Sequence, residues 1–130
     1  MSRDFNKNKV AVLTGAAKKI GRSTAIKLAE QGFNILIHTG GKSIEEAKDT
    51  IKLLEKFKIK SNYVTGDLAN LETINIIKDA ALKLGTPSVL VNNAGLRIHE
   101  HFEKIDYKDW KKVMTVNVDA SFLCAQALIN

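Results

Sequence analysis

VLTGAAKKIGRSTA, residues 12–25, joins a short apolar run to a helical pattern through a turn that contains Gly15 and Gly21. A turn of this kind leaves the first N–H groups of the following helix without partners, and together with the helix dipole they attract anions. Gly15 permits the tight turn, and Gly21 permits close packing where the helix begins. Lys18 and Lys19 stand between the two glycines. The stretch therefore predicts an anion site that carries additional positive charge.

Short apolar runs and longer helical patterns alternate along the whole chain. The apolar runs predict buried strands at Val10–Leu13, Asn34–His38, Asn62–Thr65 and Val89–Val91. The intervening patterns predict helices at Arg22–Gln31, Ile44–Phe57 and Leu71–Leu84, and a last helix that starts near Asp106 and continues to Asn130. Such alternation is typical of parallel sheets with right-handed crossovers. The sequence thus predicts the α/β class, with a Rossmann-like doubly wound parallel sheet in one domain, residues 1–130.

Residues that favour helix ends stand at several predicted boundaries. Gly32 and Gly85 follow predicted helices as C-terminal stops. Asn70 is expected to cap the third helix. Ser43, followed three residues later by Glu46, predicts a capping box at the start of the second helix.

The last predicted helix has no stop signal. Its apolar positions keep helical spacing up to the terminus, at Val113, Met114, Ala120, Phe122, Ala125 and Leu128. The four predicted strands are also fewer than the roughly six of a complete dinucleotide-binding sheet. We therefore expect an incomplete fold, truncated within its fourth long helix, with the outer apolar residues Phe122 and Leu128 exposed.

The composition excludes several classes of protein. The 20 basic and 14 acidic residues give a net charge of +6, but no aromatic or arginine-rich platform accompanies the lysines, so no nucleic-acid partner is expected. No apolar run approaches the ~18 residues of a membrane helix, and the first residues do not resemble a signal peptide. The single Cys124 cannot pair within the chain and is expected to be a small core residue. We expect a cytoplasmic protein without a membrane partner.

The segment after the second predicted strand, ILIHTGGKS at residues 35–43, contains no acid. A domain that binds NAD usually has Asp or Glu there, about 20 residues beyond the glycine turn, to bind the ribose 2′-hydroxyl. His38, Thr39, Lys42 and Ser43 stand in this segment instead. A carboxylate would repel a 2′-phosphate, whereas lysines attract one. We therefore expect NADP(H) to be preferred over NAD(H), with Lys42 and a lysine of the glycine turn on either side of the phosphate.

Two other kinds of site are considered. A Walker A loop is excluded because five residues separate Gly15 from Gly21 and Arg22 follows. His99 and His101 alternate in a way that suggests a metal pair, but the sequence offers no third ligand. Exposed loop histidines are the favoured interpretation, and no metal site is expected.

Together these segments resemble the short-chain dehydrogenase/reductase family over essentially the whole chain. Four motifs carry the resemblance in order: VLTGAAKKIGRS matches the TGxxxGxG loop, followed by GDL at 66–68, VNNAG at 91–95 and VNV at 116–118. The resemblance implies hydride transfer between a nicotinamide cofactor and a small-molecule carbonyl. Lys19 replaces the middle glycine of the loop. With it the loop is most similar to pteridine reductases, which use NADPH, while 3-oxoacyl-carrier-protein reductases and sugar dehydrogenases stay open.

The resemblance also implies roles for single residues. Asp67 and Leu68 would contact the adenine, the segment 93–95 would contact the nicotinamide ribose, and Asn117 would be the catalytic asparagine that orients a water for the proton relay. Either Asn92 or Asn93 would also form hydrogen bonds between strands. The expected cofactor-binding residues are Gly15, Ala17, Lys18, Lys19, Ile20, Gly21, His38, Lys42, Ser43, Asp67, Leu68, Asn93, Ala94 and Gly95.

The family's catalytic serine and Tyr-x-x-x-Lys pair would lie beyond residue 130. Tyr107 and Lys111 formally fit this spacing, but they precede Asn117, and we interpret the match as coincidence. We expect the 130-residue chain alone to be inactive, and the longer parent enzyme to be a homo-tetramer or dimer. The alternative is a catalytically inactive fragment that binds a dinucleotide or a partner.

Overall fold

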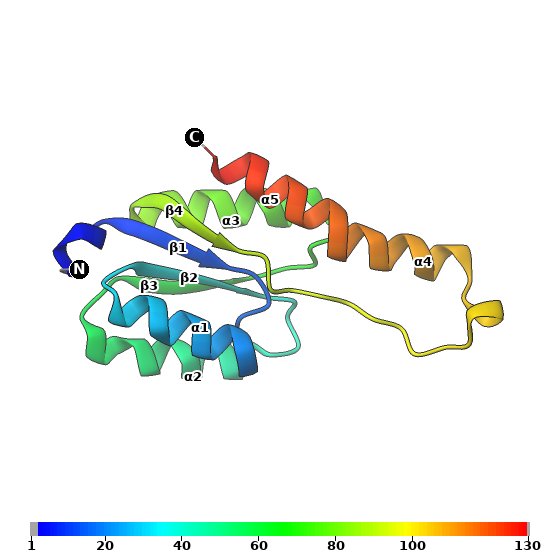
Figure 1. Ribbon diagram of the computed structural model, residues 1–130, viewed down its shortest axis with the longest axis horizontal. Helices are drawn as coiled ribbons and strands as arrows, with labels where there is room; N and C mark the ends of the chain where they lie inside the picture. The colour runs from blue at the N-terminus through cyan, green and yellow to red at the C-terminus, as the bar shows by residue number, and fades with distance from the viewer. Residues whose placement is uncertain (1–2, 130) are drawn as a thin grey trace.

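The computed structural model describes residues 3–129. Its centre is a parallel sheet of four strands in the order β3-β2-β1-β4 (Figure 1). The strands are β1 (Lys9–Leu13), β2 (Asn34–Thr39), β3 (Ser61–Thr65) and β4 (Thr86–Val91). The α-helices are α1 (Lys19–Glu30), α2 (Ile44–Leu54), α3 (Leu71–Leu84), α4 (Tyr107–Met114) and α5 (Ala120–Leu128). The predicted α/β class and Rossmann-like parallel sheet are confirmed.

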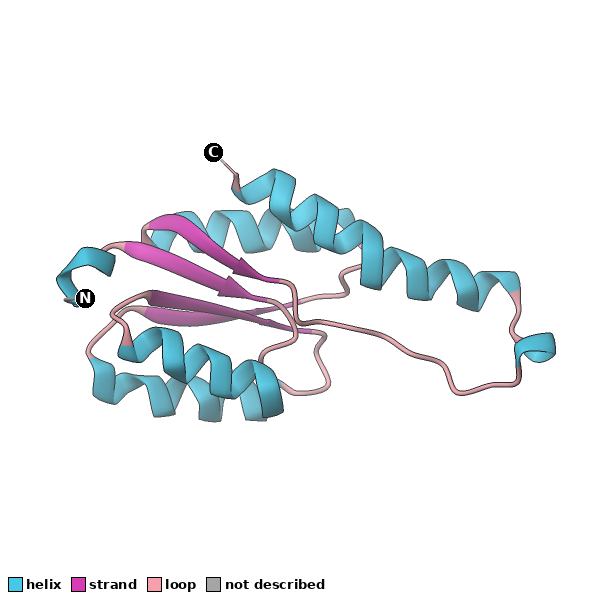
Figure 2. Ribbon diagram, in the orientation of Figure 1, coloured by secondary structure: helices cyan, strands magenta, loops and turns pink. Residues whose placement is uncertain are grey.

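Each face of the sheet carries its own apolar core. α1 and α2 cover one face, and α3 and α5 cover the other (Figure 1 and Figure 2). Along β1, Ala11 and Leu13 pack beneath α1 and α2, whereas Val10 and Val12 pack beneath α3 and α5. All four side chains are fully buried. This double burial is why the strand has a continuous apolar run instead of an alternating pattern.

α4 and α5 form one long rod, joined by a π-helical turn at Thr115–Asp119. α4 extends beyond the sheet, whereas α5 packs beside α3 (Figure 1). α5 buries Ala120, Cys124 and Leu128, at intervals of four residues. Phe122 is 63% exposed, as expected, but Leu128 is only 9% exposed, so its expected exposure is wrong. The extra residue of the π turn rotates the side chains of α5 about the helix axis relative to those of α4. The sequence prediction assumes one uninterrupted α-helix, so it places the side chains after the π turn at the wrong angle.

Most helix ends follow the predicted signals. Gly32 and Gly85 adopt positive φ values of 93° and 145° after α1 and α3. The side chain of Asn70 accepts a hydrogen bond from the N–H of Glu72 at 3.0 Å. Ser43 precedes α2 but makes no side-chain cap bond, so the predicted capping box is wrong. Its ψ of 37° departs from the extended conformation that places a capping oxygen over the first turn.

Several element boundaries differ from the predicted ones. α1 already begins at Lys19, within the glycine turn. β4 begins at Thr86, before the predicted start at Val89. It pairs with β1 through Thr86 and Pro87, and the register then shifts by one residue, so that Ser88 has no partner on β1. Proline is tolerated in a strand beside such an irregularity. The predicted continuation of the last helix to Asn130 lies outside the described residues. Within residues 3–129, no helix is both long and apolar enough to cross a membrane.

Candidate functional site

A cavity of about 570 Å³ lies at the carboxyl ends of the strands. Loops from all four strands form its walls, and α4 with the π turn closes one side. Nine of the residues expected to bind a cofactor line it: Gly15, His38, Lys42, Ser43, Asp67, Leu68, Asn93, Ala94 and Gly95. The structure thus brings together side chains from four segments that are far apart in sequence. This edge of a parallel sheet is where ligands bind in such folds.

Gly15 and Gly21 are required by the backbone around them. Gly15 has a φ of 59°, and a Cβ built on it would lie 2.7 Å from the Cα of Ala94. A Cβ on Gly21 would lie 2.4 Å from the Cα of Ala16. Both distances are below any normal contact, so each position excludes a side chain. The absence of these side chains lets the first loop approach the β4 loop and the start of α1.

Hydrogen bonds join the β1 loop to the β4 loop. The Thr14 hydroxyl accepts from the backbone N–H groups of Asn93 at 3.2 Å and Ala94 at 3.1 Å. The Asn93 side chain donates to the carbonyl of Gly15 at 2.9 Å. Of the two asparagines considered, Asn93 therefore makes the link between the two loops, while Asn92 is exposed. The link holds two walls of the cavity in a fixed relation.

His38 is buried near the end of β2 and connects this strand to the loops after β1 and β3. Its Nδ1 lies 3.3 Å from the backbone N of Gly15, and its Nε2 lies 2.8 Å from the carbonyl oxygen of Gly66. Because a carbonyl can only accept, Nε2 carries the proton and Nδ1 accepts from Gly15. Burial lowers the pKa of His38, against smaller opposing effects of the Gly66 carbonyl and Asp67. A neutral His38 therefore acts on the cavity by holding its loops, not by offering a charge.

The start of α1 is open to a ligand. Lys18 occupies the N-cap position without a side-chain cap bond, and the first N–H groups of the helix have no intrahelical partners. Lys19 adopts a φ of 55°, in the left-handed region that the glycine of the family motif would favour. Lys18, Lys19 and Ile20 are exposed and lie outside the cavity lining. Their side chains therefore do not meet Lys42 within the cavity.

Ala17 is buried as a whole residue, at 3% exposure, and lies outside the cavity lining. Asp67 faces the cavity, and its Oδ1 accepts from the N–H of Ala69 at 2.9 Å. The cap of α3 is Asn70, which excludes the alternative that Asp67 caps this helix. Leu68 lies beside Asp67 on the wall and is largely buried.

Asn117 fastens the β4 loop to the long helix. Its Oδ1 accepts from the N–H of Leu96 at 2.7 Å, and its Nδ2 donates to the carbonyl of the same residue at 2.8 Å. The sequence places Asn117 on an apolar face with Val113 and Met114, as a buried amide. That expectation is wrong: the residue is exposed and belongs to the π turn, which rotates it toward Leu96.

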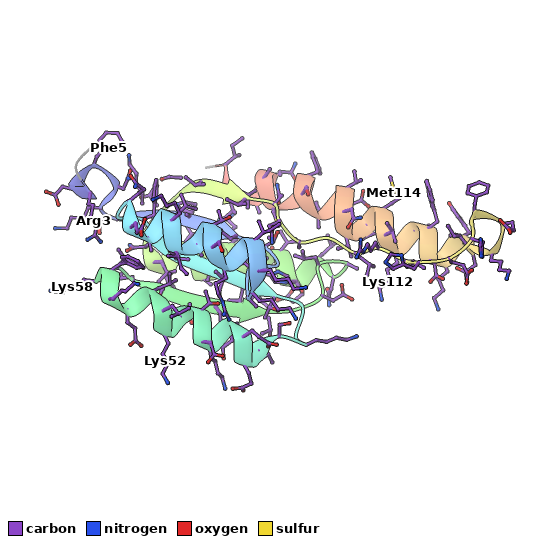
Figure 3. All side chains as sticks on the ribbon, turned by 60° about the horizontal axis from the view of Figure 1, so that its bottom comes forward. Arg3, Phe5, Lys52, Lys58, Lys112 and Met114 are labelled. Carbon is purple, nitrogen blue, oxygen red and sulfur yellow. The ribbon has the colours of Figure 1, made fainter. Side chains whose placement is uncertain are left out.

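The lining also includes Thr39, Gly40, Gly66, Leu96, Lys112 and Val116. Thr39 and Gly40 belong to the segment after the second strand, and Gly66 and Val116 belong to the GDL and VNV motifs. Sequence reasoning missed Leu96 and Lys112. Lys112 on α4 supplies a second lysine to the lining, and Figure 3 labels it and Met114 on different sides of this helix. Its spacing of four residues from Val116, next to Asn117, is the signal that could have indicated it.

The other candidate groups lie away from the cavity lining. Tyr107 and Lys111 are at the exposed start of α4, with the Lys111 Nζ 5.6 Å from the Tyr107 ring centroid. His99 and His101 are exposed in the loop before α4. Among residues 3–129, no three His, Cys, Asp or Glu side chains are grouped so as to hold a metal ion.

One protein family matches the chain over nearly its whole length. The short chain dehydrogenase model matches residues 9–130. The chain is 35% identical over 125 residues to the 3-oxoacyl-[acyl-carrier-protein] reductase FabG of Staphylococcus epidermidis, which covers 92% of this chain and 49% of that protein. The chain therefore spans about half the length of the curated relatives it matches.

Many solved structures share this fold, and two of them serve as examples. Acetoin dehydrogenase YohF from Salmonella typhimurium superposes with a TM-score of 0.83 and 32% identity, covering 93% of this chain and 48% of that one. A short chain dehydrogenase from Mycobacterium paratuberculosis bound to NAD superposes with a TM-score of 0.84 and 25% identity, covering 94% and 49%.

Proposed function

Because the chain belongs to the short-chain dehydrogenase family, we propose that it forms the cofactor-binding half of an NADP(H)-dependent reductase of small-molecule carbonyl compounds. Enzymes of this family bind a nicotinamide dinucleotide, which supplies or accepts the hydride when bound. The observation that carries the proposal is the cavity at the carboxyl edge. Gly15 of the close glycine turn and Lys42 of the acid-free β2 loop line this cavity, and the open start of α1 follows the same turn just outside the lining.

The residues at this edge fit a dinucleotide. The free N–H groups at the start of α1 suit the pyrophosphate, and Gly15 leaves room for its approach. Asp67 retains a carboxylate oxygen for the exocyclic amine of adenine, with Leu68 beside the ring. The segment Asn93–Gly95 lies on the wall where the nicotinamide ribose would be held. Asn117 acts on this ribose site by holding Leu96, and in the longer enzyme it would orient the water of the proton relay.

The charge at the β2 loop supports the proposed preference for NADP(H). Lys42 and Ser43 line the cavity there, and residues 35–43 contain no carboxylate. A lysine with a hydroxyl beside it favours a 2′-phosphate, whereas the acid typical of NAD sites would repel it. Lys18 and Lys19 lie outside the cavity lining, so they would add long-range attraction and close on the phosphate only after moving their side chains.

Titration of the chain with NADPH and NADH, followed by nucleotide fluorescence, tests the proposal. We expect NADPH to bind about tenfold more tightly, equivalent to about 1.4 kcal/mol. Lys42→Glu should remove or reverse this preference. Lys52→Glu on the exposed side of α2 is the matched control and should preserve it (Figure 3). Equal affinity for both nucleotides in the unmodified chain would refute NADP(H) preference.

A second candidate is a dinucleotide-binding module without catalysis. Its supporting observation is that Tyr107 and Lys111, the sole Tyr-x-x-x-Lys match in the sequence, lie away from the cavity lining. An assay of carbonyl reduction with NADPH separates the two candidates, because a module would bind the nucleotide without turnover. For the longer enzyme we propose a cytoplasmic homo-tetramer or dimer. The exposed apolar face of α4 and α5, with Trp110, Met114 and Phe122, supports this assembly.

A further inference from the structure

A buried polar network connects the glycine turn to α2. Thr50 on α2 has no exposed surface. Its hydroxyl oxygen lies 2.7 Å from the carbonyl oxygen of Ala17 in the glycine turn and 3.0 Å from that of Glu46 on its own helix. The same hydroxyl accepts a hydrogen bond from the Nε of Arg22 at 2.8 Å. A threonine of one helix thus reaches the loop that precedes another.

Arg22 completes the network from the α1 side. Its Nη2 lies 3.0 Å from the carbonyl oxygen of Glu46 and 3.3 Å from that of Ala17. The Thr50 hydroxyl has one proton, which it donates to one carbonyl at a time, preferably to Ala17 at the shorter distance. The two N–H groups of Nη2 serve both carbonyls, so both oxygens are satisfied in either arrangement. Such a fully satisfied buried network specifies one geometry.

The position of the Ala17 carbonyl fixes the peptide that follows it. A trans peptide is planar, and its C=O and N–H groups point in opposite directions. Because Thr50 and Arg22 hold the Ala17 carbonyl toward α2, the N–H of Lys18 points away from α2. This peptide directly precedes the free N–H groups of α1. The network therefore determines how the first turn of α1 is presented to an anion.

The network also connects two helix starts. Glu46 and Thr50 belong to α2, whose first turn follows the cavity residues Lys42 and Ser43. A rotation of α1 against α2 would break the bonds of Arg22 to Thr50 and Glu46. The start of α1, proposed for the pyrophosphate, is consequently held at a set separation from Lys42 and Ser43, proposed for the 2′-phosphate.

We propose that Thr50 and Arg22 are positioning residues, which hold the glycine turn in the conformation that binds the pyrophosphate of the dinucleotide. Neither side chain lines the cavity, so both act through the Ala17 carbonyl. This inference rests on the proposed dinucleotide function. It extends that function, because the affinity for the pyrophosphate would depend on the hydrogen bonds of Thr50 and Arg22 to the Ala17 carbonyl.

Two ligand fragments separate positioning from general stability. ADP-ribose contains the pyrophosphate without a 2′-phosphate, and 2′-AMP contains a phosphate at the 2′ position without the pyrophosphate. Thr50→Val keeps the side-chain shape and removes the hydroxyl, whereas Thr50→Ser keeps the hydroxyl. Thr24→Val is the matched control, because the Thr24 hydroxyl bonds only the Ile20 carbonyl of its own helix. Binding of each fragment to the chain is measured by NMR titration, with circular dichroism and a thermal melt to monitor folding.

We expect Thr50→Val to weaken ADP-ribose binding about tenfold, as is typical for the loss of a buried hydrogen bond. Binding of 2′-AMP should stay within about twofold, and Thr50→Ser and Thr24→Val should bind both fragments like the unmodified chain. An equal loss for both fragments, or no loss for ADP-ribose, would overturn the positioning role.

Arg22→Lys provides the second test and decides the question should Thr50→Val not fold. The lysine keeps the charge but cannot reach Thr50, Ala17 and Glu46 together. We expect it to weaken ADP-ribose selectively by about threefold, because Thr50 still holds the Ala17 carbonyl; unchanged ADP-ribose affinity would contradict the inference. If the unmodified chain binds neither NADPH nor NADH, the proposed function fails, which is distinct from a failure of positioning alone.

Discussion

Replacing Lys19 by glycine should raise stability and lower affinity for NADPH at the same time. Lys19 has a φ of 55°, and a side chain in the left-handed region costs about 1–2 kcal/mol. Glycine removes that cost but gains about 0.5–1 kcal/mol of disorder in the unfolded chain. The net stabilisation therefore lies between about 0 and 1.5 kcal/mol, with a midpoint of about 0.75 kcal/mol, or a rise in Tm of about 3 °C for a domain of this size. The loss of one charge near the start of α1 should weaken NADPH binding about threefold.

Lys58→Gly is the matched control for this experiment. Lys58 is also exposed and has a left-handed backbone conformation, with a φ of 57°. It lies just before the amino end of β3, whereas Lys19 follows the carboxyl end of β1 (Figure 3). We expect the same gain in the free energy of unfolding, measured by urea denaturation, and unchanged NADPH affinity. Lys19→Ala keeps the backbone strain and removes the charge, so it should weaken binding without stabilising. A Lys19→Gly variant that is less stable than the unmodified chain would refute the assignment of strain.

Three further predictions concern the cavity. Lys112→Ala should weaken NADPH binding about threefold at low salt, because Lys112 lines the cavity. Lys111→Ala, at the neighbouring position of the same helix, should leave the affinity unchanged. Equal effects of both variants in fluorescence titrations would contradict the role of Lys112. Gly15→Ala should destabilise the chain by about 2–4 kcal/mol and abolish nucleotide binding, because it combines a left-handed φ with a clash against Ala94; urea denaturation with wild-type stability would exclude this. The lowered pKa of His38 means that the unfolded chain takes up its proton more readily, so the free energy of unfolding should fall as pH decreases below about 6.5, and His38→Asn should flatten this dependence between about pH 5 and pH 7. An identical pH profile for both chains would show that His38 does not contribute.

The order of strands and helices could be predicted from the sequence because it depends on patterns within short segments. The apolar run of β1 and the stop at Gly32 each report a local preference that the fold preserves. Leu128 was assigned to the wrong face because the π turn inserts a rotation that no single residue signals. Ser43 failed as a cap because its backbone conformation, not its residue type, decides where the hydroxyl lies.

The sequence predicts those residues of the candidate site that belong to local motifs. The glycine geometry of Gly15 follows from the turn itself. The role of His38 does not, because both of its hydrogen bonds go to backbone groups of other strands' loops. Lys112 and Thr50 were missed for the same reason: each acts across a gap between elements that only the packed sheet brings together.

The two hydrogen bonds between Asn117 and Leu96 divide the long connection after β4 into two mechanical parts. The part before Leu96 belongs to the cavity, since Thr14 and Asn117 fix it at both ends. The part from Arg97 to Asp106 continues away from the sheet toward α4, with most of its side chains exposed (Figure 2). Changes of length or composition in this outer part therefore leave the part before Leu96 in place, because Asn117 holds Leu96. New side chains can therefore be accepted in the outer part without moving the residues that line the cavity.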